Sequence, residues 1–373
     1  MKTINAFIND KLQNREKNSS LRNLSSKTGL IDFCSNDYLG FSKSTELKSL
    51  IESYLNQHPS YPTGATGSRL ISGNDDFTET LETEIALFHN SESALIFNSG
   101  YDANVGLFSS VPQRGDTIIL DELIHASIID GARLSFATRF TFKHNDLTSL
   151  EDKLKLAKGT IFIGIESIYS MDGDEAPLIE IAKLAQTYSA ALFVDEAHAI
   201  GIFGSNGKGL VEQYHLEDKV FARVITFGKA LGCHGAAVLC NKSIQMYLIN
   251  FARSFIYTTA ASFYTHLSVN MAYQLLAKFD TSLIQQKIEL FKNEVTEIYE
   301  QFVKSSSPIQ SLIIQGNSKT KKVSAILQEK GFDVRAILHP TVPLGKERLR
   351  ICLHTFNTDT EIKNLAKNLK ENL

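Results

Sequence analysis

From about Ser93 to Asn241 the sequence alternates short apolar, β-branched runs with stretches of helical periodicity. This pattern is typical of a mainly parallel β-sheet that is covered by helices. Seven strands are expected, at Ala94–Asn98, Thr117–Asp121, Phe140–His144, Thr160–Glu166, Ala191–Asp195, Arg223–Phe227 and Ala236–Cys240. The helices expected between them include Ser127–Ala137, Leu147–Ala157 and Pro177–Ser189. The predicted fold class is therefore α/β, with a large domain built on a seven-stranded sheet.

The character of the chain changes after Asn241. A long helical pattern runs from Ser262 to Val303, and the last seventy residues predict a small α/β domain. Its expected elements are the strands Leu312–Gln315, Asp333–Ala336 and Arg348–His354 and the helices Thr320–Lys330 and Asp359–Asn372. We therefore expect an N-terminal segment (1–60), a large domain (61–250), connecting helices (251–305) and a small C-terminal domain (306–373).

Charge and composition exclude several classes of protein. The 373 residues include 38 Lys and Arg and 41 Asp and Glu, a net charge of −3, so no basic excess is available to bind a nucleic-acid backbone. No apolar run approaches the roughly 20 residues of a membrane helix, and Met1–Ser20 lacks the apolar core of a secretory signal. A cytoplasmic protein is expected. Four cysteines without a CxxC pair give no reason to expect a metal site.

An acid and a histidine follow a predicted strand at Asp195-Glu-Ala-His198. Ligands of open parallel sheets bind beyond the carboxyl ends of the strands, so both side chains are expected where a binding site would lie. The placement alone is not specific, because an Asp after a strand more often caps a turn.

A lysine follows another predicted strand at Thr226-Phe-Gly228-Lys229. Most lysines are solvated surface charges. The small and apolar residues around Lys229 favour a partly desolvated amine, which is what a Schiff base with a carbonyl compound requires.

A third segment, Asn98-Ser99-Gly100-Tyr101, leads from a strand into a predicted helix. Backbone N–H groups at a helix start, approached closely at a glycine, can bind a phosphate. Each of the three segments is weak evidence alone. Together they supply a phosphate anchor, an acid for a ring nitrogen and an amine for an aldehyde, which is the set that pyridoxal 5′-phosphate requires.

Eight motifs in chain order, from about residue 22 to the C-terminus, resemble the α-oxoamine synthases, which are pyridoxal-phosphate enzymes of the aspartate aminotransferase-like fold type I. The motifs are Ser35–Gly40, Gly67-Ser-Arg69 with Ser72-Gly73, Asn98–Tyr101, Ile124–Ser127, Glu166–Asp174, Asp195–His198, Thr226–Lys229 and Pro340–Pro343 with Arg348-Leu-Arg350. Eight collinear matches are far more specific than any one of them.

The resemblance implies a role for each matching residue near the cofactor. Lys229 would bind the cofactor aldehyde, Asp195 would pair with the ring nitrogen, His198 would contact the phenolic oxygen and His125 would stack on the ring. Lys229, His125 and Asp195 would be catalytic. The remaining cofactor contacts would come from Gly100, Tyr101, Ser170 and Thr226, together with Thr258 or Thr259 of the opposite subunit of a homodimer.

The resemblance also implies how the substrates are bound. Arg350 would bind the carboxylate of an amino acid, with Asn36 in the same set of substrate residues, while Arg22 and Thr341 would meet an acyl group. The implied reaction is decarboxylative condensation of an amino acid with an acyl thioester. Alanine and a pimeloyl thioester, carried by coenzyme A or a carrier protein, are favoured, as in biotin synthesis.

Three alternatives remain. Asp195–His198 also spells the motif of a DEAH-box ATPase, but the chain has no P-loop of the required spacing. A non-catalytic scaffold subunit would be expected to lack the lysine, and Lys229 is present. The third alternative is a sister enzyme that uses glycine or serine, such as glycine C-acetyltransferase (2-amino-3-ketobutyrate ligase), 5-aminolevulinate synthase or serine palmitoyltransferase. The sequence distinguishes these enzymes poorly, because a substrate difference of a single methyl group leaves no recognisable motif.

Two departures from the family pattern are visible. The chain is short between Leu24 and Asp32, so a reduced N-terminal hairpin is expected, and Gly64-Ala-Thr-Gly67 and Gly232–Gly235 are unusual. Neither involves the residues expected at the cofactor.

Overall fold

A computed structural model describes residues 3–24 and 29–373. The chain forms two compact units. The large unit contains residues 37–170 and 175–281, and the small unit contains residues 1–36, 171–174 and 282–373. The shortened stretch expected between Leu24 and Asp32 includes residues 25–28, which lie outside the described residues. Within the described ranges, no helix has the length and apolar character needed to cross a bilayer.

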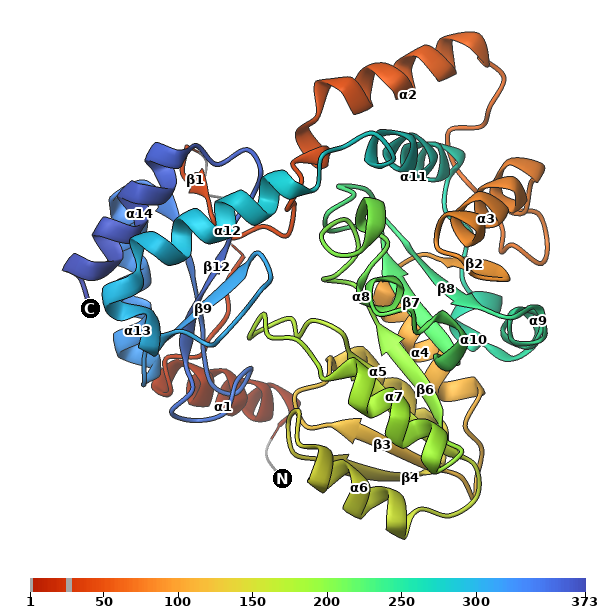
Figure 1. Cartoon of the computed structure of the whole chain (residues 1–373), viewed down its shortest axis with the longest axis horizontal. Coiled ribbons are helices and arrows are strands. Elements are labelled where there is room, and N and C mark those ends of the chain that lie inside the picture. Colours follow the sequence, from red (N-terminus) through yellow and green to blue (C-terminus); the bar gives the residue numbers. More distant parts are fainter. Residues whose placement is uncertain (1–2, 25–28) are drawn as a thin grey trace. The chain divides into compact units, whose positions relative to one another are not determined.

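A seven-stranded sheet forms the centre of the large unit, in the order β2-β8-β7-β6-β5-β3-β4 (Figure 1). The strands are β2 (Ser93–Phe97), β3 (Thr117–Asp121), β4 (Thr138–Phe142), β5 (Ile161–Glu166), β6 (Ala191–Asp195), β7 (Ala222–Thr226) and β8 (Ala236–Cys240). Strands β3 to β7 pair in parallel, while β8 is antiparallel to both of its neighbours. The expected large, mainly parallel sheet is confirmed.

The edge strand β4 lies two residues earlier than the expected Phe140–His144. Thr138 and Arg139 are exposed polar residues, which an edge strand can accommodate. They were not predicted as part of the strand because the prediction relied on buried apolar runs. His144 instead follows the strand, with its Nδ1 3.0 Å from Asp121 Oδ1.

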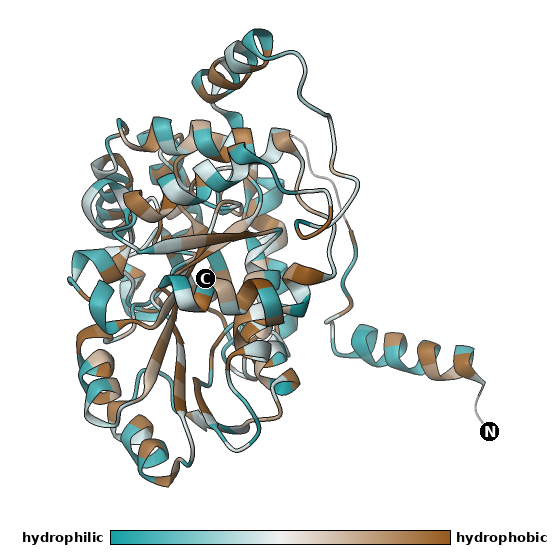
Figure 2. Cartoon of the chain, turned by 90° about the vertical axis from the view of Figure 1, so that its right-hand side faces the viewer, coloured by the Kyte–Doolittle hydropathy of each residue, from teal (hydrophilic) through white to brown (hydrophobic). Residues whose placement is uncertain are grey.

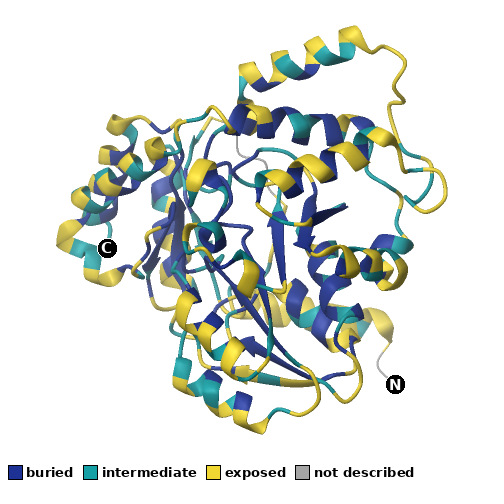
Figure 3. Ribbon diagram, turned by 45° about the vertical axis from the view of Figure 1, so that its right-hand side comes forward, coloured by how far each residue is buried: buried dark blue, intermediate teal, exposed yellow. Residues whose placement is uncertain are grey.

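The helices of the large unit pack by apolar faces that the sequence pattern predicts. In α7 (Leu178–Thr187) the buried residues are Leu178, Ile181, Ala182 and Ala185. A core between the sheet and α4 (Gly100–Ser110), α5 (Ala126–Leu134) and α9 (Lys242–Phe251) includes Leu107, Ile128 and Leu248. Strands in the interior are largely brown, the apolar end of the scale, in Figure 2, and strands are largely dark blue, the buried class, in Figure 3. The other helices are α2 (Thr45–Gln57), α3 (Asp76–Phe88), α6 (Leu147–Leu156), α8 (Leu210–Gln213), α10 (Arg253–Ile256) and α11 (Phe263–Leu276).

The small unit contains an antiparallel sheet in the order β11-β12-β9 and a short parallel pair, β1 with β10. Its strands are β1 (Ile31–Asp32), β9 (Ile309–Ile313), β10 (Phe332–Asp333), β11 (Arg335–Ile337) and β12 (Arg348–Cys352). Its helices are α1 (Ile4–Lys17), α12 (Ser282–Glu294), α13 (Asn317–Glu329) and α14 (Asp359–Glu371). The strand expected at Asp333–Ala336 is two strands, because β10 pairs with β1 and β11 pairs with β12.

The long helical pattern from Ser262 to Val303 is interrupted. It forms α11, α12 and a 3₁₀ segment at Thr296–Gln301, and the boundary between the two units falls between Thr281 and Ser282. The residues expected to connect two domains are thus divided between them.

The short segment 171–174 belongs to the small unit although the chain on both sides belongs to the large one. Asp172 forms a buried ion pair with Arg348 of β12. The Gly173 carbonyl accepts hydrogen bonds from Ser305 Oγ (2.6 Å) and Ser307 Oγ (2.8 Å). These buried polar contacts hold the segment in the small unit.

Candidate active site

Three neighbouring parallel strands of the large unit end in polar residues. Glu166 ends β5, Asp195 ends β6 and Thr226 ends β7, and Glu166 and Asp195 are opposite each other in the strand register. Because parallel strands share a direction, their carboxyl ends lie along one edge of the sheet. The sequence therefore brings these side chains together through the sheet itself.

The Asp195 carboxylate is buried and held from two sides. Its Oδ1 accepts from the Ala197 backbone N–H at 2.9 Å, and its Oδ2 accepts from Asn104 Nδ2 of α4 at 2.7 Å. The carboxylate therefore has a fixed orientation at the strand end.

Lys229 and His198 are adjacent in the large unit. Lys229 Nζ lies 2.8 Å from His198 Nε2, and His198 Nδ1 lies 2.8 Å from the hydroxyl oxygen of Tyr38. Tyr38 is completely buried, and Lys229 is half-buried. Tyr38 belongs to the Ser35–Gly40 motif, and the sequence predicts no individual role for it.

The start of α4 has the features of an anion site. Helix α4 begins at Gly100, after Ser99, whose Oγ accepts from the Asp102 N–H. A Cβ at Gly100 would lie 2.6 Å from Thr226 Cγ2, so only glycine allows this approach. Thr226 Oγ1 is buried, and no hydrogen-bond partner for it exists among the described residues.

Other predicted cofactor residues lie around this helix start. Tyr101 is exposed, and its hydroxyl donates to Asp130 Oδ2 at 2.5 Å. Asn98 Nδ2 donates to Thr258 Oγ1 (3.0 Å) and to the Thr259 carbonyl (2.8 Å). The two threonines thus lie beside Asn98 of their own chain, and their expected role toward an opposite subunit stays a prediction.

His125 and Ser170 each form a hydrogen bond with a residue for which the sequence predicts no individual role. His125 is exposed, and its Nδ1 is 2.7 Å from Ser127 Oγ. The Ser170 N–H donates to Glu166 Oε2 at 3.2 Å. Ser127 in turn accepts from Asn104 Nδ2 at 3.1 Å.

Glu166 is a buried carboxyl group beside Asp195. Burial, reinforced by the charge of Asp195, raises the pKa of Glu166 to about 8, while Lys229 and the backbone N–H groups of Ser170 and His125 oppose the shift. Its Oε1 has no hydrogen-bond partner within the described part of the chain. This shift favours the protonated acid of Glu166 at neutral pH.

The predicted substrate residues form two pairs within the small unit. Arg22 Nη2 donates to Thr341 Oγ1 at 2.8 Å, and both residues are exposed. Arg350 Nη2 donates to Asn36 Oδ1 at 2.9 Å, and Arg350 is buried. Each pair joins residues more than 300 positions apart in the chain.

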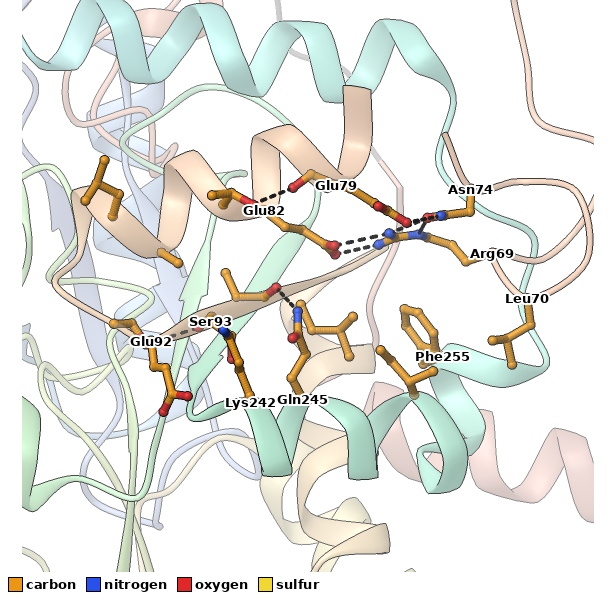
Figure 4. A pocket seen from close by; sticks show the side chains of 17 residues that line it. Arg69, Leu70, Asn74, Glu79, Glu82, Glu92, Ser93, Lys242, Gln245 and Phe255 are labelled. Carbon is orange, nitrogen blue, oxygen red and sulfur yellow. Dashed lines mark hydrogen bonds and ion pairs between the residues drawn. The ribbon is translucent and has the colours of Figure 1, made fainter. Parts of the chain in front are cut away.

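A cavity of about 700 Å³ lies elsewhere in the large unit, along the edge strand β2 (Figure 4). Glu82 from α3 accepts the Ile96 N–H at 2.7 Å and pairs with Arg69, and Gln245 Nε2 donates to the Ala94 carbonyl at 2.8 Å. These side chains form hydrogen bonds with backbone groups at the edge of the sheet, so their role is structural. None of the predicted site residues lines this cavity.

Comparison with known proteins identifies the family. The model of the family "aminotransferase class I and II" matches residues 28–369. An 8-amino-7-oxononanoate synthase of Emericella nidulans is 42% identical and covers 99% of this chain and 95% of its own length. The chain belongs to the α-oxoamine synthases. The expected family and enzyme class are thereby confirmed.

Two solved structures share the fold of this chain. The crystal structure of 8-amino-7-oxononanoate synthase from Francisella tularensis is 31% identical, with a TM-score of 0.78, and covers 92% of this chain and 99% of that one. A serine palmitoyltransferase of Sphingomonas wittichii has a TM-score of 0.88 at 24% identity, covering 99% and 98%, and shows the shared fold alone. The expected fold type I architecture is confirmed.

As an α-oxoamine synthase the protein uses pyridoxal 5′-phosphate, which confirms the expected cofactor. The large unit fits this group. The unpartnered Thr226 hydroxyl and the close approach at Gly100 suit a phosphate, the fixed Asp195 carboxylate suits a ring nitrogen, and the Lys229 amine suits an aldehyde. The assignment of each residue to a part of the cofactor stays a prediction.

Proposed function

We propose that the protein condenses L-alanine with a pimeloyl thioester to give 8-amino-7-oxononanoate, carbon dioxide and the free thiol of the acyl carrier. In this reaction the alanine Cα forms a bond to the acyl carbon, the thioester C–S bond breaks, and the bond from Cα to the carboxylate breaks. The observation that carries the proposal is the 42% identity to an 8-amino-7-oxononanoate synthase over 99% of the chain.

The residues of the large unit divide the chemistry among them. When bound, pyridoxal phosphate supplies an electron-withdrawing ring. Asp195 keeps the ring nitrogen protonated, and the Lys229 amine removes and returns the proton at the alanine Cα. His198 Nε2, 2.8 Å from Lys229 Nζ, orients that amine, and Tyr38 fixes the imidazole from its other side.

Arg350 binds the carboxylate of alanine, for which a planar guanidinium is better suited than an ammonium group. Asn36 orients it through the 2.9 Å hydrogen bond to Nη2. Arg22 and Thr341, already paired at 2.8 Å, contact the acyl substrate. Positioning two substrates for a single encounter is worth on the order of 7–11 kcal/mol of the barrier, so these residues affect rate as well as binding.

Turnover with defined substrates tests the proposal. The purified holoenzyme is mixed with alanine, glycine or serine labelled with ¹⁴C in the carboxyl group. Pimeloyl-coenzyme A, a pimeloyl carrier protein, acetyl-coenzyme A or palmitoyl-coenzyme A is then added, and released ¹⁴CO₂ is counted. We expect release with alanine and a pimeloyl donor to exceed every other pair by at least tenfold in kcat/KM.

The remaining outcomes identify a different family member. Preference for glycine with the acetyl thioester would indicate a glycine C-acetyltransferase, and serine with the palmitoyl thioester would indicate a serine palmitoyltransferase. Absence of ¹⁴CO₂ with every pair would contradict the proposal altogether. Comparing the two pimeloyl donors shows which carrier the enzyme accepts.

A further inference from the structure

A continuous set of hydrogen bonds connects Asp195 to His125. Asn104 Nδ2 donates to Asp195 Oδ2 (2.7 Å) and to Ser127 Oγ (3.1 Å), and Ser127 Oγ lies 2.7 Å from His125 Nδ1. Asn104 is 2% exposed and Ser127 is completely buried. Of these four residues, Asp195 and His125 are the two for which the sequence predicts a role.

The chemistry of Asp195 fixes the direction of the first bond. A carboxylate accepts hydrogen bonds, so the amide nitrogen of Asn104, not its oxygen, must face Asp195. The two amide hydrogens then serve Asp195 and Ser127. The hydroxyl of Ser127 is thereby an acceptor toward Asn104, and its single hydrogen is left for another partner.

Two donors converge on His125 Nδ1. The backbone N–H of Ser127 points at this nitrogen from 3.3 Å, and the Ser127 hydroxyl hydrogen has no other acceptor among the described residues. A nitrogen that accepts from two donors cannot carry a proton of its own. In the neutral ring the proton must then be on Nε2.

We propose that Asn104 and Ser127 are positioning residues that hold His125 as the neutral tautomer protonated on Nε2, with its orientation tied to that of Asp195. The proposal deepens the proposed function, because it concerns the residue expected to stack on the cofactor ring. A neutral imidazole adds no second positive charge next to a pyridine ring that Asp195 keeps protonated.

The charges around His125 do not by themselves determine its state. Desolvation lowers the pKa of His125 although the ring is partly exposed, and the Lys229 ammonium acts in the same direction. The carboxylates of Asp195 and Asp130 act in the opposite direction. The two hydrogen bonds to Nδ1 act on one ring nitrogen and therefore favour one neutral tautomer. Desolvation disfavours the charged ring but does not select between the two neutral tautomers.

The tautomer is measured directly by NMR. Holoenzyme labelled with ¹⁵N-histidine is studied by long-range ¹H–¹⁵N correlation between pH 5.5 and 8.5, and the His125→Asn variant identifies the signals of His125 among the ten histidines. We expect an unprotonated Nδ1 and a protonated Nε2 from pH 6.5 upward. A protonated Nδ1 in the neutral wild-type ring would overturn the proposal without any other variant.

Variants then test the two positioning residues. Ser127→Ala removes the hydroxyl donor and is expected to raise the titration midpoint of His125 by about one pH unit, the effect of about one hydrogen bond, and to admit the Nδ1-protonated tautomer. Asn104→Ala frees the Ser127 hydroxyl to act as an acceptor and is expected to admit the same tautomer. Ser127→Thr retains a hydroxyl and should restore the wild-type pattern.

A matched control separates positioning from folding. Ser135→Ala removes another buried serine hydroxyl, at the opposite end of α5, where it donates to the Ala132 carbonyl at 2.8 Å. We expect it to lower stability without changing the His125 tautomer. An unchanged tautomer in Ser127→Ala would refute the proposal. Because the spectra require no turnover, this result is independent of which amino acid or thioester the enzyme accepts.

Discussion

The Lys229 amine is the group on which the proposed chemistry depends most directly. Lys229→Ala is expected to abolish the long-wavelength absorbance that pyridoxal phosphate shows when joined to a lysine, and to abolish turnover, because it removes the amine that lies beside His198. Absorbance spectra and the ¹⁴CO₂ assay measure both. Lys242→Ala, at the start of α9, should change neither property. Product formation by Lys229→Ala would disprove the assignment.

Glu166 gives a prediction about pH and stability. In the unfolded chain its pKa is near 4.5, whereas in the fold it is about 8, so between these values the folded protein binds more protons than the unfolded one. The free energy of unfolding therefore falls as pH rises through this window, by up to about 1.4 kcal/mol per pH unit from this group. The Glu166→Gln variant has no carboxyl group at this position, so it does not show this pH-dependent loss of stability.

The stability of Glu166→Gln relative to wild type is thus expected to increase from pH 5 to pH 8. Denaturant unfolding of both proteins at several pH values measures the difference. Glu180→Gln replaces an exposed carboxylate on α7 and should show no comparable trend. A constant difference between wild type and Glu166→Gln would mean that Glu166 is ionised in the fold.

At the scale of elements, the start of α4 and the end of β7 form one feature. A methyl group at Gly100 would displace the Thr226 side chain, since it would lie 2.6 Å from Thr226 Cγ2. Gly100→Ala is expected to weaken binding of pyridoxal phosphate by roughly tenfold or more, equivalent to about one lost hydrogen bond. Titration of the apoenzyme with the cofactor measures this affinity. Gly64→Ala, where a Cβ meets nothing within 4 Å, should bind normally.

The elements also show what the sequence could and could not predict. Strands Thr117–Asp121, Ala191–Asp195 and Ala236–Cys240 were predicted with the bounds observed, because they are buried apolar runs. The predicted position of the edge strand β4 was two residues too late, because the first residues of this strand are polar. The pairing of β1 with β10 depends on a contact between segments 301 positions apart, as in Ile31 with Phe332. A local sequence pattern cannot predict such a contact.

The same reasoning applies to the candidate site. Residues that follow strands, such as Asp195 and Lys229, could be found because strand ends are visible in the sequence. Tyr38 and Asn104 could not, because their partners lie 160 and 91 positions away. For Asn104, the available local signal is a polar residue on the buried face of α4, where Ala103, Leu107 and Phe108 are also buried.

At the scale of the whole molecule, the segment 171–174 joins the small unit through Asp172 and Gly173. Gly173 has a φ of +80°, and a Cβ there would overlap the Ile309 carbonyl oxygen of β9. Gly173→Ala is therefore expected to lower the free energy of unfolding by about 2 kcal/mol or more. Equilibrium denaturation of the holoenzyme measures the loss.

Gly345→Ala provides the matched comparison. Gly345 has a φ of +79° in the same unit, but a Cβ there meets nothing within 4 Å. The Gly345→Ala variant has the same backbone strain as Gly173→Ala but no overlap with another atom. We expect it to lower the free energy of unfolding by about 1 kcal/mol. Equal losses in the two variants would show that contact with β9 contributes nothing.

The composition of the small unit from three separate stretches of chain has a consequence for biosynthesis. Its sheet needs β12, and β12 needs Asp172 to neutralise its buried Arg348 and Phe33 to accept the Cys352 N–H at 2.9 Å. Asp172 and Phe33 leave the ribosome long before Arg348 is translated. Nascent chains must therefore keep these early segments available, and the small unit can assemble only when translation is almost complete.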